Sequence, residues 1–159
     1  MAQVGLILSD EGRTITAVND STTTAITAGD PVYFTTNNDV LGTTFASARG
    51  AYAYTDVKVK TVLGSATGYL LPAGIALNDA GTAGDVQLTI ALEGVFAHPT
   101  NSDTEAGNII QFDAATSQKV DKLAAATTSP NIITTQNKVG RALTGGSADG
   151  KYIIWKLAL

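Results

Sequence analysis

Cysteine is absent from the chain, and its absence removes a whole class of functions. Without thiols there are no disulfides, no thiolate metal ligands and no cysteine nucleophile, so neither stability nor chemistry depends on sulfur. Charged residues make up only 15% of the 159 residues, against roughly 25% in an average soluble domain. The exterior must then be built largely from Thr, Ser, Asn, Ala and Gly. This composition favours a β-rich protein, because Thr suits a pleated surface and Gly suits its turns.

Basic residues are too few and too dispersed to indicate a nucleic-acid partner. Ten Lys and Arg residues stand against fourteen Asp and Glu, which gives a net charge of −4 and a pI near 4.7. Proteins that bind phosphate backbones display clustered Lys and Arg instead. Long hydrophobic runs are missing as well: nothing approaches the roughly 20 apolar residues of a membrane helix, and the chain starts without the basic segment of a signal peptide. We expect neither nucleic acid nor membrane as a partner, and synthesis in the cytoplasm.

Strict alternation of apolar and polar residues is the main positive signal, and helical periodicity is nearly absent. Residues 86–93 alternate along their whole length, and residues 51–61 do the same with Lys58 and Lys60 on the polar side. The one helix-friendly stretch, 121–126, is too short for more than a single turn. At this length we expect one all-β, barrel-like domain with little helix. Further strand candidates are 4–8, 13–18, 31–35, 109–112, 138–143 and 152–157.

Two parts of the sequence echo one another. Residues 28–34 (AGDPVYF) resemble 106–112 (AGNIIQF), and residues 74–77 (GIAL), ahead of a polar loop and a strand, resemble 140–143 (GRAL). Such self-similarity is typical of repeated structural units. It predicts an internal duplication, with β-halves over 28–94 and 106–159 that close into one barrel-like core. The alternative is a chance echo in a β protein rich in Gly and Ala.

A phosphate-loop pattern is nearly complete near the end of the sequence. Gly145, Gly150 and Lys151 have the spacing of a loop whose amides and lysine would hold phosphates at a helix N-terminus. Tyr152 stands where such a loop needs Ser or Thr for Mg²⁺, and a strand-like run follows instead of a helix. The pattern therefore indicates a hairpin loop and no nucleotide site.

The single histidine, His98, would have to serve any histidine-based triad or metal site. Its neighbours place it at a strand end that enters a polar loop, which favours an ordinary loop or interface histidine. No serine lies in a Gly-x-Ser-x-Gly elbow. The carboxylates fall in turns, where Asp satisfies backbone amides. We therefore predict no enzyme, no catalytic residue, no metal ligand and no cofactor. The carboxylates assigned to turns are Asp79, Asp85, Asp103, Glu105, Asp113 and Asp149.

A succession of short motifs covers most of the chain and resembles the tailed-phage capsid decoration, or cement, proteins of the lambda head-protein-D type. The motifs are residues 11–16 (EGRTIT), 29–32 (GDPV), 74–76 (GIA), 92–96 (LEGVF) with Pro99, 106–107 (AG) with 112–113 (FD) and 119–120 (KV), and 140–143 (GRAL). Each motif alone is a loose pattern of small and apolar residues, so the specificity of the resemblance comes from the order of the motifs along the chain. Segments 36–72 and 123–137 are longer than the compact family core needs.

The resemblance implies a β-tulip or barrel-like protomer that assembles as a homotrimer. It would bind the major capsid protein on the outer surface of the virion, at threefold and quasi-threefold positions. A chain made in the host cytoplasm would then bind only the expanded capsid and stabilise it. The alternative is another virion or cell-surface structural module, such as a head fibre base, a tail component or a surface-layer protein.

The first ten residues form a separate prediction. The apolar run precedes the turn that opens the family-like core, so we expect an N-terminal arm over 1–10 and a β domain over 11–159. An extended arm can add a strand to a partner's sheet edge. The alternative is that this run is the first core strand. The residues predicted to contact the capsid or a neighbouring subunit are Val4, Gly5, Leu6, Ile7 and Leu8.

Overall fold

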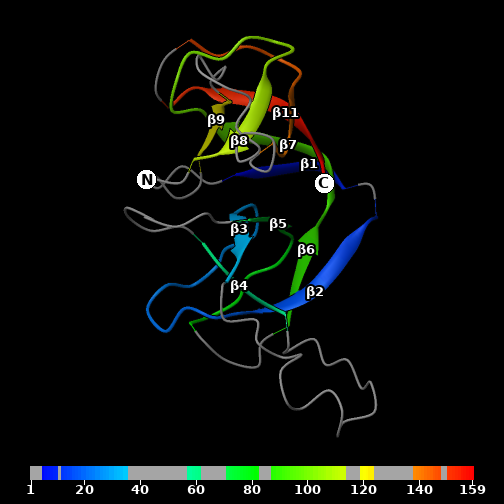
Figure 1. Cartoon of the computed structure of the whole chain (residues 1–159), viewed down its shortest axis with the longest axis vertical. Coiled ribbons are helices and arrows are strands. Elements are labelled where there is room, and N and C mark those ends of the chain that lie inside the picture. Colours follow the sequence, from blue (N-terminus) through cyan, green and yellow to red (C-terminus); the bar gives the residue numbers. More distant parts are fainter. Residues whose placement is uncertain are drawn as a thin grey trace, which may run out of the picture.

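The structure is all-β, as the alternation predicted. The computed structural model describes residues 5–10, 12–35, 57–61, 71–82, 87–113, 119–123, 138–147 and 150–159. Within these ranges there are eleven strands and no helix. They form one domain built from two units, a closed barrel and a six-stranded sheet, which follow one another along the long axis of the molecule (Figure 1). The predicted strand region before residue 57 lies outside the described residues.

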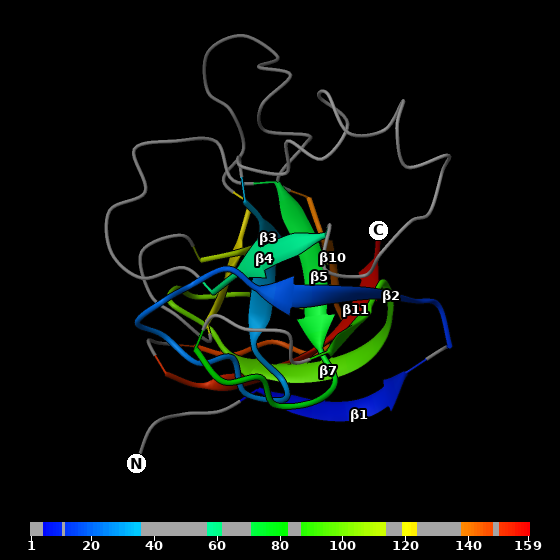
Figure 2. The same ribbon diagram turned by 90° about the horizontal axis from the view of Figure 1, so that it is seen from below.

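The barrel unit closes five strands in the order β2-β4-β3-β5-β6. Its strands are short, and alternation sets their two faces: on β4, Val59 is buried between the partly exposed Lys58 and Lys60. Figure 2 looks onto this unit, with β2, β3, β4 and β5 wrapping around its interior. The strands are β2 (Thr14–Asn19), β3 (Pro31–Phe34), β4 (Lys58–Lys60), β5 (Pro72–Ala76) and β6 (Leu88–Ala91).

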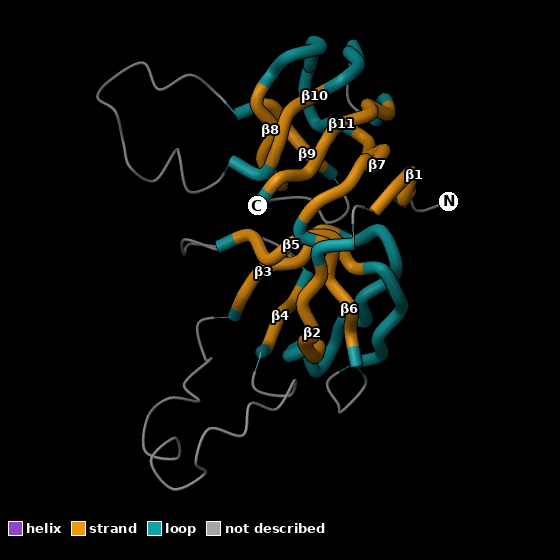
Figure 3. Tube along the Cα trace, turned by 90° about the vertical axis from the view of Figure 1, so that its right-hand side faces the viewer, coloured by secondary structure: helices purple, strands orange, loops and turns teal. Residues whose placement is uncertain are grey.

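The sheet unit arranges six strands in the order β1-β7-β11-β10-β8-β9. Along β11 buried and exposed residues alternate without exception, so one face of the sheet is core and the other is surface. Figure 3 shows this unit stacked above the barrel, with β1 beside β7. The strands are β1 (Leu6–Asp10), β7 (Glu93–Pro99), β8 (Ile109–Phe112), β9 (Val120–Lys122), β10 (Gly140–Ala142) and β11 (Tyr152–Ala158).

The two units repeat the same strand pairing. The antiparallel pairs β2·β6, β5·β6, β3·β5 and β3·β4 of the barrel correspond to β7·β11, β10·β11, β8·β10 and β8·β9 of the sheet unit. The parallel pair β2·β4 closes the barrel. Its counterpart is a single parallel bridge between Thr100 and Val120. Strand β1 has no counterpart in the barrel, and it extends the sheet at the edge of β7.

The echo around residues 28–34 and 106–112 corresponds to one turn made twice. Gly29 donates its N–H to Ala76 O at 2.7 Å, and Gly107 donates to Ala142 O at 2.8 Å. Both glycines hold a positive φ, 92° and 91°, which L side chains rarely adopt. The sequence is repeated at these two places because both turns require a glycine with a positive φ. The repeated pairing also takes in β2 and β7, which lie before the segments where the sequence echo begins.

The residue after each of these glycines also plays the same part. Asp30 Oδ2 accepts a hydrogen bond from the N–H of Thr27 at 2.7 Å, and Asn108 Oδ1 accepts one from the N–H of Glu105 at 2.9 Å. Asp and Asn are favoured at such positions because their short side chains satisfy nearby backbone amides. The two turns thus have the same hydrogen bonds, and each leads directly into the corresponding strand, β3 or β8.

Two apolar clusters form the core. One fills the barrel. The other is larger, includes the buried rings of Phe96, Phe112 and Trp155, and joins the units, because Tyr33, Ile75 and Ala91 of the barrel pack in it. Matching positions line both clusters: Ile90 lies opposite Ile15 and Ala76, as Trp155 lies opposite Phe96 and Ala142. The barrel cluster is Ala17, Ile26, Val32, Val59, Ala73, Ala76, Ala80, Leu88 and Ile90. The joining cluster adds Phe96, Ile110, Phe112, Val120, Val139, Ala142, Ile153, Trp155 and Leu157 to the three barrel residues.

Two local predictions were wrong. Asp121 and Lys122, in the stretch assigned at most one helical turn, belong to strand β9, because pairing with β8 and burial of Val120 outweigh the local preference. The run 86–93 is not one strand, since β6 ends at Ala91 and β7 begins at Glu93. Leu92 makes the bend between them, and there the chain passes from the barrel to the sheet unit.

Candidate functional site

The N-terminal segment is placed as an edge strand and not as a projecting arm. In β1, Leu6 lies opposite Ala97, Ile7 opposite Phe96 and Asp10 opposite Gly94. The physical reason is that β7 offers a free edge of backbone donors and acceptors, which an apolar neighbouring strand of the same chain satisfies. This arrangement matches the first-strand alternative for the run. Val4 lies outside the described residues.

Part of β1 remains available to a partner. The register slips at Leu8, which is the extra residue of a β-bulge between Ile7 and Ser9. Ile7 is 38% exposed and Leu8 50% exposed, so both present apolar surface to the outside. Among the described strands, β1 pairs only with β7, which leaves its other edge without a strand neighbour.

Gly5 anchors the start of β1 against both units. A Cβ at this position would collide with the His98 ring and with the carbonyl oxygen of Gly29. The contact also works in reverse, since a Cβ on Gly29 would collide with the Gly5 backbone. Only glycine fits at both positions, so β1 touches the barrel turn as closely as two backbones can approach.

His98 lies at the centre of this junction and is fully buried. The sequence placed it at a strand end that enters a polar loop, and it is the second-last residue of β7. The reading of it as a loop or interface histidine was wrong, because its ring lies in the core, where Trp155 Nε1 donates a hydrogen bond to its Nδ1 at 3.1 Å. Its Nε2 lies 2.7 Å from Gly29 O. One neutral tautomer satisfies both bonds, with the proton on Nε2 donated to Gly29 and Nδ1 accepting from Trp155.

The environment of His98 favours that neutral form. Burial lowers its pKa from 6.5 to about 4, although the hydrogen bond to Gly29 acts in the opposite direction. Both ring nitrogens are therefore occupied by hydrogen bonds, and the ring does not take up a second proton near neutral pH. It links β7, β11 and the barrel turn, and its role is structural.

We expect Gly29→Ala to destabilise the protein more than Gly107→Ala. The two positions have nearly the same positive φ, but a Cβ meets nothing within 4 Å at Gly107 and meets the Gly5 backbone at Gly29. Gly107→Ala should lose about 1–2 kcal/mol of unfolding free energy from the backbone conformation. Gly29→Ala should lose about 1–3 kcal/mol beyond that from overpacking. Urea denaturation of both variants measures the difference, and equal losses would contradict the packing of β1 on the barrel turn.

Tyr33 is a second buried polar group at the boundary between the units. Its hydroxyl has no hydrogen-bond partner among the described residues, and its ring packs edge-on against Phe112 with centroids 5.4 Å apart. Burial first, and then the Asp113 carboxylate, raises the pKa of Tyr33 above its usual range. The phenol therefore stays neutral and contributes packing between barrel and sheet unit.

The structure also places two other candidates for chemistry, Lys151 and Asp79. Lys151 is followed directly by strand β11, which confirms the predicted strand-like run in place of the helix of a phosphate loop. Asp79 Oδ1 accepts the N–H of Ala28 at 2.8 Å, which is the turn role expected for it. Across the described ranges, no three His, Asp or Glu side chains are grouped to hold a metal ion. Nor do those ranges contain a helix with the length and apolar character that crossing a membrane requires.

Comparison with known proteins gives a distant likeness. No family model and no curated protein matches the chain, so membership of the decoration family stays a resemblance carried by its motifs. Among solved structures, the head fibre gp8.5 N base of bacteriophage phi29 is similar over 92% of this chain and 93% of that chain, with a TM-score of 0.49 and 12% sequence identity. At that identity and score the likeness assigns no role to any residue of this chain.

Proposed function

We propose that this chain is a non-enzymatic capsid decoration protein that binds the outer surface of the expanded capsid of a tailed phage. The observation that carries the proposal is the ordered succession of decoration-family motifs. Several of them coincide with features that the fold requires. The motif at 29–32 opens β3 through the Gly29 turn, and the motif at 106–107 opens β8 through the Gly107 turn.

The described architecture suits a binding role. Its buried histidine and tyrosine are both held neutral inside the core, so the groups with the most perturbed pKa values lie away from the surface. Among the described residues, exposed large apolar side chains lie on β1 (Ile7 and Leu8) and on β11 (Tyr152 and Ile154). Such surfaces recognise other proteins through backbone pairing and side-chain pockets.

The mechanism of the proposed function is physical. Binding sites that exist only in the expanded lattice allow a protein that binds them to stabilise that lattice by mass action. A homotrimer at a threefold position contacts several major capsid proteins at once, so each contact after the first gains from effective concentration. Neither cofactor nor nucleic acid takes part.

Residues Val4 to Leu8 keep a role in this proposal as a contact with the capsid or with a neighbouring subunit. Ile7 and Leu8 are exposed on a strand whose outer edge is unpaired among the described strands. A strand from the partner can add to this edge and continue the sheet β1-β7-β11. The contact thus extends a strand already in place, without the ordering cost of a free arm.

The deciding experiment compares expanded and unexpanded capsids of the phage whose genome encodes this chain. Purified chain is added to undecorated particles of both kinds, and bound protein and the capsid melting temperature are measured. The proposal expects saturable binding to expanded particles only, with a higher capsid melting temperature after binding. Binding to neither form would contradict it. Attachment at a few positions per particle without a change in melting temperature would favour the alternative, a head fibre base or a similar module.

A further inference from the structure

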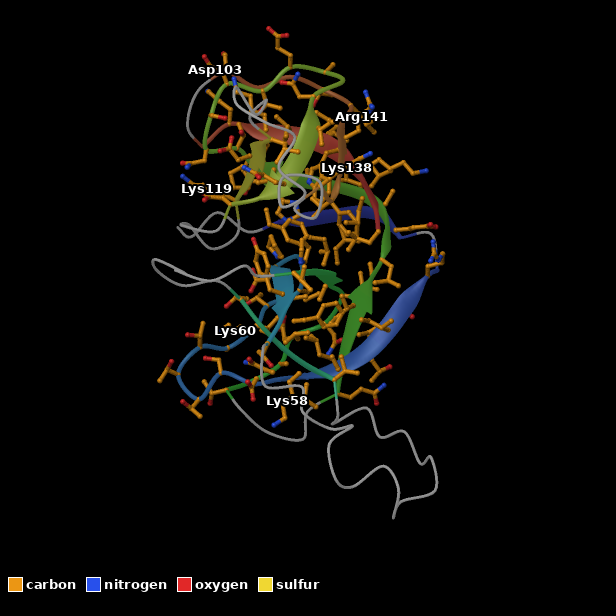
Figure 4. All side chains as sticks on the ribbon, in the orientation of Figure 1. Lys58, Lys60, Asp103, Lys119, Lys138 and Arg141 are labelled. Atoms are coloured by element: carbon orange, nitrogen blue, oxygen red, sulfur yellow. The ribbon has the colours of Figure 1, made fainter. Side chains whose placement is uncertain are left out.

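Strand β1 is attached to the sheet unit along one edge. Among the described strands it pairs only with β7, and the bulge at Leu8 interrupts that pairing. Its exposed side chains, Ile7 and Leu8, belong to neither apolar cluster. Figure 4, in the orientation of Figure 1, shows β1 near the boundary of the two units, between Arg141 of the sheet unit and Lys60 of the barrel. The described contacts that attach β1 are thus its backbone pairing with β7 and the close fit of Gly5.

The chain that follows β1 is fixed, so a movement of β1 would end at Gly12. Arg13 O accepts the N–H of Leu92 at 2.8 Å, and the Arg13 guanidinium pairs with the Glu93 carboxylate. These contacts hold the chain just ahead of β2 against the bend between β6 and β7. Gly12 has a positive φ of 82°, and a Cβ there would meet nothing within 4 Å. Because glycine also adopts extended conformations at little cost, Gly12 can act as a hinge.

The His98 ring lies directly against the residue that precedes β1. A Cβ added at Gly5 would collide with Nε2 and Cδ2 of the ring. The ring is also bonded to Gly29 O through Nε2 and to Trp155 Nε1 through Nδ1. Gly5, the Gly29 turn and Trp155 thus enclose a histidine that is fully buried. Undocking of β1 would remove the Gly5 side of this enclosure and open the ring to water.

A second proton on His98 does not fit this arrangement. Nδ1 accepts the hydrogen bond from Trp155, whereas an imidazolium carries a proton on both nitrogens and accepts none. Two N–H groups would then face each other across 3.1 Å, inside an enclosure that leaves the ring no room to turn. Burial of the positive charge adds to the cost. The proton is accommodated only once β1 has left and water reaches the ring.

The described ionisable groups on the elements around the ring do not alter this expectation. On β11 they lie on the exposed face, opposite to the core face that carries Trp155. On β1 and β7 they lie at the ends farther from His98. Burial and then the bond to Gly29 are what shift the pKa of the ring. The groups are Asp10 on β1, Glu93 on β7, Tyr152 and Lys156 on β11, and Asp30 and Asp79 at the barrel turn.

We propose that His98 is an acid-sensitive latch for β1: the neutral ring seats Gly5, and uptake of a second proton undocks β1 from β7 as far as Gly12 while the other strands stay in place. The step adds one proton from solvent at Nδ1 and breaks no covalent bond. A released β1 is an extended segment that can add to the sheet edge of another protein. The latch is a property of the chain itself and does not depend on whether the chain binds a capsid.

The direction of the pH dependence follows from proton uptake. Burial lowers the pKa of docked His98 to about 4, and a ring open to water returns towards 6.5. Between these values the released form takes up a proton that the docked form does not, so docking weakens as the pH falls from 6.5 to about 4. Above pH 6.5 the latch has no effect. The ratio of released to docked β1 should rise about 30-fold between pH 7.5 and pH 5.

A disulfide that holds β1 in place tests the latch. Ser9 and Val95 lie opposite one another on β1 and β7, and the chain has no other cysteine to interfere with Ser9→Cys/Val95→Cys. The imidazole signal of His98, the only histidine, is titrated by NMR in the oxidised and the reduced form of this variant. With about 1% of β1 released at neutral pH, the reduced form should have a pKa about half a pH unit above the oxidised form. Thr16→Cys/Thr89→Cys, which joins β2 and β6 beyond the hinge, should show no such difference.

The same pKa in the oxidised and reduced forms would overturn the latch. Leu6→Cys/Ala97→Cys, at the other end of β1, repeats the test should the first pair fail to close or fold. Hydrogen exchange of the unmodified chain adds a second readout, because at pH 5 the amides of β1 should exchange faster than those shared by β10 and β11. Equal protection of both strand pairs would mean that only global unfolding releases β1, and would equally refute the proposal. Capsid binding is measured separately, so failure of the proposed function leaves this result unchanged.

Discussion

Replacing Trp155 by Ala is expected to lower the unfolding free energy by about 3–5 kcal/mol. Trp155 is fully buried, and its ring packs against Phe96 and Phe112 with centroids 5.9 and 6.1 Å away. The substitution leaves a cavity where the barrel and the sheet unit meet. It also removes the donor to His98 Nδ1, which then stays buried without that bond.

Ile154→Ala is the matched control, because it lies on the same strand with its side chain on the opposite face, 37% exposed. It should cost less than about 1.5 kcal/mol. Unfolding by urea has to be followed by far-ultraviolet circular dichroism, since Trp155 is the only tryptophan and its fluorescence is lost in the variant. Equal losses in the two variants would show that the joining cluster is not the centre of stability.

The alternation of apolar and polar residues in the sequence predicted best those strands that have one buried and one exposed face. β8 has the predicted bounds, and β11 extends the predicted range by one residue, because each alternates between core and solvent. β9 was missed, since its three residues carry too little periodicity and are held by pairing with β8 and by the Thr100–Val120 bridge. Both contacts lie in other strands or loops, on the far side of the segment 114–118, so the three residues of β9 carry no pattern that shows them.

The candidate surfaces were predictable only in part. Ile7 and Leu8 were recognised because an apolar run ahead of a turn is conspicuous, but their attachment to β7 depends on a strand that follows about eighty residues later. The pairing of Arg141 with Lys156 was not predicted, since the two residues become neighbours only through the register of β10 and β11. The sequence echo does indicate which residues occupy matching positions in the two units, because aligning 74–77 with 140–143 places Ile75 at Arg141.

His98 shows why burial cannot be predicted from neighbouring residues alone. Its place at the end of a strand was predicted, but its burial was not, since it occupies the position that Ala17 has in the barrel. A larger polar ring fits there because Trp155 and Gly29 satisfy both of its nitrogens. The partner on Gly29 belongs to the other unit, so the histidine fixes the two units against each other.

Acid should destabilise the protein through this histidine. Burial lowers the pKa of folded His98 from 6.5 to about 4. Between these two values the unfolded chain takes up a proton that the folded protein does not, so the unfolding free energy falls as the pH falls from 6.5 to about 4. Above pH 6.5 the group has no effect on the pH dependence. The pKa difference corresponds to a total loss of about 3 kcal/mol.

The His98→Gln variant isolates this contribution from the carboxylates, which also titrate at low pH. Glutamine keeps a donor for Gly29 O and an acceptor for Trp155 Nε1 but does not titrate. Urea denaturation at several pH values from 7.5 to 4.5 gives the slope of unfolding free energy for both proteins. Near pH 5 the unmodified chain should lose up to about 1.4 kcal/mol per pH unit more than the variant. Parallel slopes would mean that His98 accepts its proton in the folded state, and the neutral link between Trp155 and Gly29 would then be wrong.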